Sequence, residues 1–153
     1  MRKTRPVPRR RAARQGRPTR SMLAAMTALA REARERARAP YSRFKVGAAL
    51  KTRTGEIVTG CNIENATYGL TMCAERVAVF KAVSEGLADF DVVTVVADAK
   101  RLTPPCGPCR QILWEFCGDL LVHMANLKGR SRTMRLSDLL PMPFDSGSLG
   151  TTK

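Results

Sequence analysis

Three cysteines are spaced so that their sulfurs could bind one metal ion. Cys106 and Cys109 form a C-x-x-C pair at the predicted start of a helix, and Cys73 stands at the predicted start of an earlier one. Helix N-termini carry partial positive charge and unpaired N–H groups, which stabilise thiolates. A helix–strand–helix unit can bring two such termini side by side, so the three thiolates could converge. A zinc ion with three protein ligands keeps a fourth tetrahedral position open, which is typical of catalytic sites.

A carboxylate and two guanidinium groups accompany these cysteines. Glu75 is two residues beyond Cys73, in the same first turn, which places it beside the metal without making it a ligand. A carboxylate in that position can take a proton from water and pass it to a substrate nitrogen. Arg76 directly follows Glu75, Arg110 directly follows Cys109, and a guanidinium that hydrogen-bonds a thiolate would restore Lewis acidity to a site with three negative sulfurs.

Other interpretations of the cysteines are open at this point. An isolated C-x-x-C also occurs in redox and structural zinc sites, and Cys106-Gly107-Pro108-Cys109 resembles a thioredoxin-type pair. That motif alone would leave Cys73 and Glu75 without a role. The five cysteines and the lack of a recognisable export signal favour a metal or redox site in a reducing compartment over a disulfide scaffold. The combined C-x-E and P-C-x-x-C pattern matches the signature of zinc deaminases.

The hydrophobic pattern predicts the elements that would position these groups. Ser21 is a plausible N-cap of the first helix, and Pro40 ends that helix at the preceding residue. Gly55 supplies the turn of a hairpin, and Gly86 ends the second helix. Helices alternate with strands, so we expect one mixed sheet between helical layers. The predicted helices are 22–39, 73–84, 107–117 and 137–140, and the predicted strands are 44–52, 56–61, 91–98, 120–125 and 133–136.

The positive charge is concentrated at the start of the chain. The 153 residues are 44% apolar and predict one domain, with a net charge of +14. Residues 1–21 hold nine of the 27 Lys and Arg residues, no acid and three prolines, so we expect a disordered arm before a domain at 22–153. A solvated tail, a polyanion-binding arm and an organelle transit peptide are the open interpretations. No apolar run approaches the roughly 18–20 residues of a membrane helix.

Four blocks of sequence resemble the cytidine deaminases of the small, homotetrameric, three-cysteine type that act on free nucleosides. The resemblance extends from about Met22 to Phe144, and an L-L-P ending at 139–141 follows the last block. Arg38, where relatives often have an aromatic residue, Pro108 and the basic arm depart from the pattern. The blocks are 39–50 (APYSRFKVGAAL), 60–66 (GCNIENA), 73–76 (CAER) running on to 81–86 (KAVSEG), and 105–111 (PCGPCRQ).

This resemblance implies a fold, a reaction and a role for each matching residue. The fold would be a three-layer α/β/α arrangement around a mixed five-stranded sheet. The reaction would be hydrolytic deamination of cytidine and 2′-deoxycytidine in pyrimidine salvage, in a cytoplasmic homotetramer with one Zn2+ per subunit. Cys73, Cys106 and Cys109 would bind zinc, Glu75 would shuttle protons, and Arg76 would hydrogen-bond the thiolates. The implied substrate contacts are Asn62 and Glu64 at the ribose, with Phe44, Ile63, Tyr68, Ala74 and, from a neighbouring subunit, Phe144.

Three other functions stay open on the sequence. A deaminase of cytosines in nucleic acid would use the arm to attract the backbone, but a carboxylate at Glu64 would repel a phosphate. A nucleoside-antibiotic deaminase of the blasticidin type shares the zinc motif, although the block around Asn62 favours cytidine. A non-catalytic zinc or redox module would leave Glu75 unused. The basic arm could contact nucleic acid, but we do not expect such a contact to be functional.

We interpret His123 as a strand residue, and Cys61 and Cys117 as buried thiols.

Overall fold

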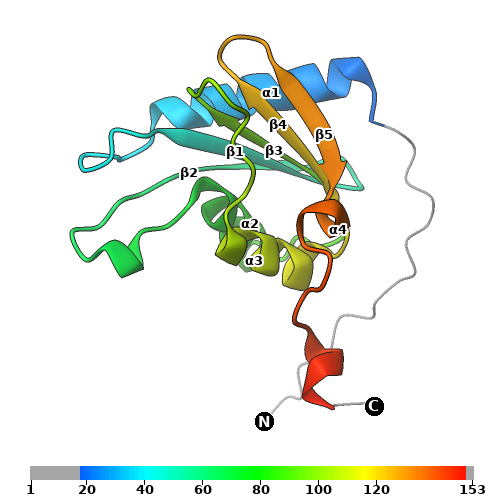
Figure 1. Cartoon of the computed structure of the whole chain (residues 1–153). Helices are drawn as coiled ribbons and strands as arrows, with labels where there is room; N and C mark the ends of the chain where they lie inside the picture. Colours follow the sequence, from blue (N-terminus) through cyan, green and yellow to red (C-terminus); the bar gives the residue numbers. More distant parts are fainter. Residues whose placement is uncertain (1–17, 151–153) are drawn as a thin grey trace.

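The computed structural model describes residues 18–150 of the chain, so nearly all of the predicted basic arm lies outside the described residues. Four α-helices and five strands alternate along this part (Figure 1). The elements are α1 (Arg20–Glu35), β1 (Val46–Thr52), β2 (Ile57–Cys61), α2 (Ala74–Ser84), β3 (Phe90–Ala97), α3 (Gly107–Cys117), β4 (Leu121–Asn126), β5 (Ser131–Arg135) and α4 (Leu136–Leu139), with two short 3-10 turns at Tyr68–Leu70 and Ser146–Leu149.

The strands form one mixed sheet in the order β2-β1-β3-β4-β5. β3 and β4 are parallel, with Val92 opposite Leu121, and the other neighbouring pairs are antiparallel. The carboxyl ends of β2, β3 and β4 therefore lie at one edge, where the chain enters α2 and α3. The predicted mixed five-stranded sheet is confirmed.

Helices cover both faces of the sheet, which explains the continuous apolar run in β3. α1 packs on one face and α2 and α3 on the other (Figure 1). On β3, Val92 and Val96 belong to the core beneath α1, whereas Val93 and Val95 belong to the core beneath α2 and α3. A strand buried on both faces has no polar face to alternate with. The three-layer prediction is confirmed.

The first helix differs from its predicted bounds at both ends. Thr19, not Ser21, is the N-cap, and its hydroxyl accepts a hydrogen bond from the Met22 backbone N–H. The helix ends at Glu35, several residues before Pro40. The reason is a tertiary contact, because Arg38 leaves the helical path and pairs its backbone with the loop after β2. This pairing brings the segment after α1 against residues 62–64.

The second helix buries a different face from the predicted one. The helical spacing of Val77, Phe80 and Val83 predicts that these residues form the apolar side of α2, but Phe80 and Val83 are each 38% exposed in the single chain. The small residues of α2 are buried instead, because the helix lies close to the sheet. The exposed Phe80 ring packs edge-on against Phe116 of α3. The buried residues of α2 are Ala74, Glu75, Ala78, Val79 and Ala82.

Two glycines allow helices to approach the sheet on opposite faces. A Cβ on Gly60 of β2 would lie 2.5 Å from the Ala74 carbonyl oxygen of α2. A Cβ on Gly47 of β1 would lie 1.9 Å from the Ala30 carbonyl oxygen of α1. Both atoms belong to helix backbones, so neither contact can be relieved by a side-chain rotation. Each helix must therefore move if its glycine is replaced.

We expect Gly60→Ala to lower the free energy of unfolding by about 1–3 kcal/mol or more and also to weaken zinc binding. The reason is that Ala74 lies between Cys73 and Glu75, so a displaced α2 moves both groups. Gly47→Ala is the matched control, which should destabilise the chain without reducing zinc per folded molecule. Urea unfolding and zinc content measure the two effects. Normal zinc binding in a destabilised Gly60→Ala protein would contradict this role.

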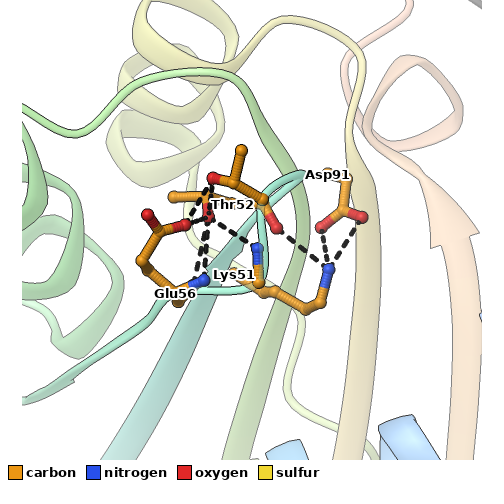
Figure 2. Close-up of polar contacts among 6 residues, drawn as sticks. Lys51, Thr52, Glu56 and Asp91 are labelled. Atoms are coloured by element: carbon orange, nitrogen blue, oxygen red, sulfur yellow. Dashed lines mark hydrogen bonds and ion pairs between the residues drawn. The ribbon is translucent and has the colours of Figure 1, made fainter.

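A polar network closes the β1–β2 hairpin and ties it to the start of β3 (Figure 2). The Thr52 hydroxyl accepts hydrogen bonds from the backbone N–H groups of Gly55 and Glu56. Gly55 has φ +111°, which favours glycine, so its predicted turn role is confirmed. The Lys51 ammonium donates to the Asp91 carboxylate at 3.2 Å. These contacts hold the end of the hairpin that is opposite to the α2 and α3 N-termini.

His123 lies in β4, as predicted, and is nearly buried. Its ring nitrogen Nδ1 is 2.8 Å from the Thr133 hydroxyl of β5.

Cys61 and Cys117 were expected to be buried, but both are only partly buried. Within residues 18–150, no helix combines the length and the hydrophobicity that a membrane crossing requires.

Burial lowers the pKa of His123 below its usual 6.5, because desolvation disfavours the imidazolium. Below pH 6.5 the unfolded chain therefore binds more protons at this residue than the folded chain does. The contribution of neutral His123 to the free energy of unfolding is thus complete above pH 6.5 and decreases as the pH falls. NMR titration of this ring, the only histidine in the sequence, should give a pKa below 6.5. His123→Gln should remove this contribution to the pH dependence. A titration midpoint at or above 6.5 would show that the ring is solvated.

Candidate functional site

The three predicted ligand sulfurs come together at the N-termini of α2 and α3. Cys73 is the N-cap of α2, Cys106 is the N-cap of α3, and Cys109 lies in the first turn of α3. Sγ of Cys106 is 3.8 Å from that of Cys73 and 3.3 Å from that of Cys109, and all three sulfurs lie within 4.8 Å of one another. Sulfurs bound at about 2.3 Å to one tetrahedral zinc would lie about 3.8 Å apart. The spacing and the soft thiolate donors therefore fit a zinc ion.

The surroundings of these sulfurs favour a thiolate at Cys73. A hydrogen bond from the Cys109 thiol, together with Arg76, lowers the pKa of Cys73 to about 5, although partial burial opposes this. The same hydrogen bond and burial raise the pKa of Cys109. Arg76 Nη2 is 3.8 Å from Cys73 Sγ and donates at 2.6 Å to the Thr71 carbonyl oxygen. Arg76 thus lies where it can withdraw charge from a thiolate.

Glu75 is buried at the wall of the same site and is only 4% exposed. Burial, with a smaller contribution from the Cys73 thiolate, raises the pKa of its carboxyl group to about 7, although the backbone N–H of Glu75 and the Arg76 guanidinium oppose the rise. A carboxyl group with a pKa near neutrality can both accept and donate a proton. Because Glu75 follows Cys73 by two residues on α2, its position relative to the sulfurs is fixed by the first turn of that helix.

A cavity of about 190 Å³ opens beside the sulfurs and Glu75. It joins the loop before β1, the end of β2, the start of α2 and the loop between β3 and α3. Both sulfur-bearing helix N-termini contribute to it, so a bound molecule would contact the metal-binding region. The lining residues are Ser42, Phe44, Val46, Asn62, Glu64, Thr71, Cys73, Ala74, Glu75, Thr103, Pro104 and Cys106.

The two predicted ribose contacts also hold the loop that covers this cavity. Asn62 Oδ1 accepts from the Val46 N–H, and its Nδ2 donates to the Phe44 carbonyl oxygen, both at 2.8 Å. The Glu64 carboxylate accepts from the backbone N–H groups of Tyr41 and Ser42, and from the Ser42 hydroxyl. The Ser42 hydroxyl and these N–H groups lower the pKa of Glu64. An ionised carboxylate and an amide therefore face the cavity in fixed orientations.

The cavity brings together some of the predicted substrate contacts and leaves three outside. Phe44 and Ala74 line it with Asn62 and Glu64, whereas Ile63, Tyr68 and Phe144 do not in the single chain. Tyr68 is 73% exposed and packs edge-on against Tyr41, with ring centroids 5.8 Å apart. Phe144 is 60% exposed, and its carbonyl oxygen accepts from Gln111 Nε2.

Several residues at this site were not singled out from the sequence. Ser42, Thr71 and Thr103 line the cavity, and each lies in a loop. Only Ser42 belongs to one of the four sequence blocks, so it had a signal that could have identified it. Arg110 was expected to support the thiolates, but it donates to the backbone carbonyl oxygens of Pro105 and Leu139 instead. Arg110 therefore anchors the start of α3.

Comparisons with known proteins agree with this geometry. A family model described as "Cytidine and deoxycytidylate deaminase zinc-binding region" matches residues 20–125. The chain is 54% identical over 114 residues to a cytidine deaminase of Halalkalibacterium halodurans, covering 74% of this chain and 86% of that one. It is 48% identical to a cytidine deaminase of Sporosarcina psychrophila, over 81% of this chain and 92% of that one. The solved structure of a cytidine deaminase from Burkholderia pseudomallei superposes with a TM-score of 0.77 at 45% identity, covering 79% of this chain and 98% of that one.

Proposed function

Because the chain belongs to the cytidine and deoxycytidylate deaminase family, we propose that it is a zinc-dependent hydrolase that converts cytidine and 2′-deoxycytidine to uridine and 2′-deoxyuridine, with release of ammonia. The observation that supports this most directly is the buried Glu75 carboxyl group beside three converging cysteine sulfurs, at the wall of one cavity. A structural zinc site would have no use for an uncoordinated buried carboxyl group.

Cys73, Cys106 and Cys109 are the residues that would hold the zinc ion. When bound there, zinc supplies Lewis acidity, which makes a water molecule acidic enough to lose a proton near neutral pH. Three thiolates give such a site a net negative charge, which weakens this effect. Arg76, next to the Cys73 sulfur, offsets part of that charge.

Glu75 would move the protons of the reaction. Its carboxylate takes a proton from the attacking water and delivers it to ring nitrogen 3 of cytosine, while the water oxygen bonds to carbon 4. A second proton passes through Glu75 to the amino group, which leaves as ammonia. A pKa near 7 suits both transfers, because neither protonation state is strongly favoured.

The part of the cavity lined by the loop before β1, the segment after β2 and the start of α2 would bind the nucleoside. The Glu64 carboxylate and the Asn62 amide suit the 3′-hydroxyl of the sugar, since one accepts and the other both donates and accepts hydrogen bonds. The Phe44 ring and Ala74 provide apolar contact for the base and sugar. Ordering of Glu64 by Ser42 and Tyr41 keeps the carboxylate in place before substrate arrives.

A homotetramer would complete this site. Phe144 is exposed and lies outside the cavity of its own chain, which supports a contact with the nucleoside of a neighbouring subunit. We propose that Ile63 and Tyr68, also exposed, contact substrate only when a neighbouring subunit closes the cavity. The exposed rings of Phe80 and Phe116 give α2 and α3 an apolar outer face that a second subunit would cover.

Free thiolates persist in reducing surroundings, so we propose a cytoplasmic enzyme of pyrimidine salvage.

Ammonia release tests this function directly. Purified zinc-loaded protein is given cytidine, and separately a short single strand that contains cytosine. We expect turnover of the nucleoside alone, with residues 1–21 unnecessary for it. Turnover of the strand alone would mean that the ribose contacts are wrong and that the basic arm belongs to the enzyme.

A further inference from the structure

Cys106 and Cys109 are arranged as a dithiol as well as a pair of metal ligands. Cys106 is exposed at the N-cap of α3, whereas Cys109 is completely buried within the first turn. Both are free thiols, and their sulfurs are 3.3 Å apart. A disulfide bond is about 2.05 Å long, so a movement of about 1 Å would join them.

One accessible and one shielded thiol at a helix N-terminus suit thiol–disulfide exchange, since the accessible sulfur reacts first and the shielded one resolves the intermediate. We propose that Cys106 and Cys109 form a redox-active dithiol, which a small-molecule disulfide oxidises to an intramolecular disulfide with loss of the metal. The exposed Cys106 is the attacking thiol and Cys109 is the resolving thiol. This activity is separate from deamination and uses neither Glu75 nor the ribose contacts.

Oxidised glutathione is the oxidant that we expect to react. The Cys106 sulfur attacks one glutathione sulfur, the glutathione S–S bond breaks, and the first glutathione leaves as a thiolate. The Cys109 sulfur then attacks Cys106, the mixed disulfide breaks, and the second glutathione leaves as a thiolate. The two cysteine thiolates, which carry no protons while they bind zinc, lose two electrons, and the zinc ion leaves as Zn2+. One glutathione disulfide gains the two electrons and becomes two glutathione thiolates, which take up protons from solvent.

This oxidation and metal binding exclude each other. A disulfide between Cys106 and Cys109 removes two of the three sulfurs and leaves Cys73 alone, which cannot hold a zinc ion by itself. The bond would lie inside one helical turn. It therefore leaves the packing of α3 on α2 intact, because that packing rests on buried residues such as Leu113 and Val79. The oxidised chain should stay folded.

Pro108 adds to the stability of the disulfide. It lies between the two cysteines in the first turn of α3 and has no backbone N–H. The N–H groups of a first turn stabilise thiolates, so the missing donor disfavours the reduced, metal-free form. Pro108→Ala should restore a donor and shift the equilibrium toward the dithiol by about two- to fivefold, the effect of one such dipole contact.

The test uses the zinc-loaded full-length protein in buffers with a series of oxidised to reduced glutathione ratios. A chromophoric chelator reports released zinc, and alkylation followed by peptide mass spectrometry maps the disulfides. We expect one zinc released for each Cys106–Cys109 disulfide, reversal on addition of reduced glutathione and zinc, and an unchanged circular dichroism spectrum. Cys61, at the end of β2, and Cys117, at the end of α3, are internal controls that should form no intramolecular disulfide.

Three results would overturn the proposal. One is zinc that stays bound, with unreacted Cys106, at a large excess of oxidised glutathione. Another is zinc release without the Cys106–Cys109 disulfide, including a bridge between Cys73 and Cys106, whose sulfurs are 3.8 Å apart. The third is a disulfide that forms only when the circular dichroism signal is lost. Pro108→Ala, which removes no ligand, gives a second test through the shift in the glutathione ratio at half-oxidation.

Discussion

A Glu75→Gln variant should fold and bind zinc like the wild-type chain and yet lose turnover of cytidine by about 10²–10⁴-fold or more. Glutamine has nearly the same shape as a protonated glutamic acid, so it fits the buried position on α2. It cannot accept a proton from water or deliver one to a ring nitrogen. The loss should appear in kcat rather than in KM, because the substrate contacts at Phe44, Asn62 and Glu64 remain.

The matched control for this variant is Glu85→Gln, at the other end of the same helix. Glu85 is exposed at the C-cap of α2 and has no contact with the cavity, so turnover should stay at the wild-type value. Steady-state ammonia release, zinc content and thermal unfolding are measured for both variants. Retained turnover in a folded, zinc-loaded Glu75→Gln protein would refute the proton-transfer role and, with it, the proposed mechanism.

The core architecture could be predicted because apolar runs and turn glycines in the sequence determine local secondary structure. The continuous apolar run of β3 is typical of a strand buried on both faces, and the glycines at turns indicated the hairpin and the end of α2. The errors arose where tertiary contacts decide. α1 ends early because Arg38 pairs with the loop after β2. The buried face of α2 is made of small residues because Gly60 lets the helix lie close to the sheet, and hydrophobicity alone favoured the opposite face.

The residues of the candidate site likewise fall into those that the sequence could predict and those that only the fold places. The sulfurs and Glu75 could be predicted because they lie in the first turns of two helices, where spacing along the chain fixes spacing in three dimensions. Loop residues such as Ser42 and Thr103 have no such periodicity, and only the fold places them at the cavity. Arg110 shows the limit of the spacing argument, because its position beside a ligand gave no information on which acceptor it binds.

A Cys109→Ser variant should bind zinc more than about 100-fold less tightly than the wild-type chain, because the site loses one of three protein ligands and a hydroxyl is a poor replacement for a thiolate. The site also joins α2 to α3, so metal binding stabilises the packing of the two helices. Saturating zinc should therefore raise the melting temperature of the wild-type protein. A ligand at 100 times its Kd adds about 2.7 kcal/mol to the free energy of unfolding, and the variant should lose most of this increment.

Cys117→Ser is the control, because Cys117 is the last residue of α3 and does not belong to the metal-binding group. Both substitutions replace a partly or fully buried thiol in the same helix, so a loss of core packing should affect both, whereas a loss of metal should affect only Cys109→Ser. Competition with a chromophoric chelator gives the zinc affinity, and scanning calorimetry with and without zinc gives the increment in stability. A Cys109→Ser protein that still binds one zinc with wild-type affinity would show that Cys109 is a core residue, and that Cys73 and Cys106 hold the metal without it.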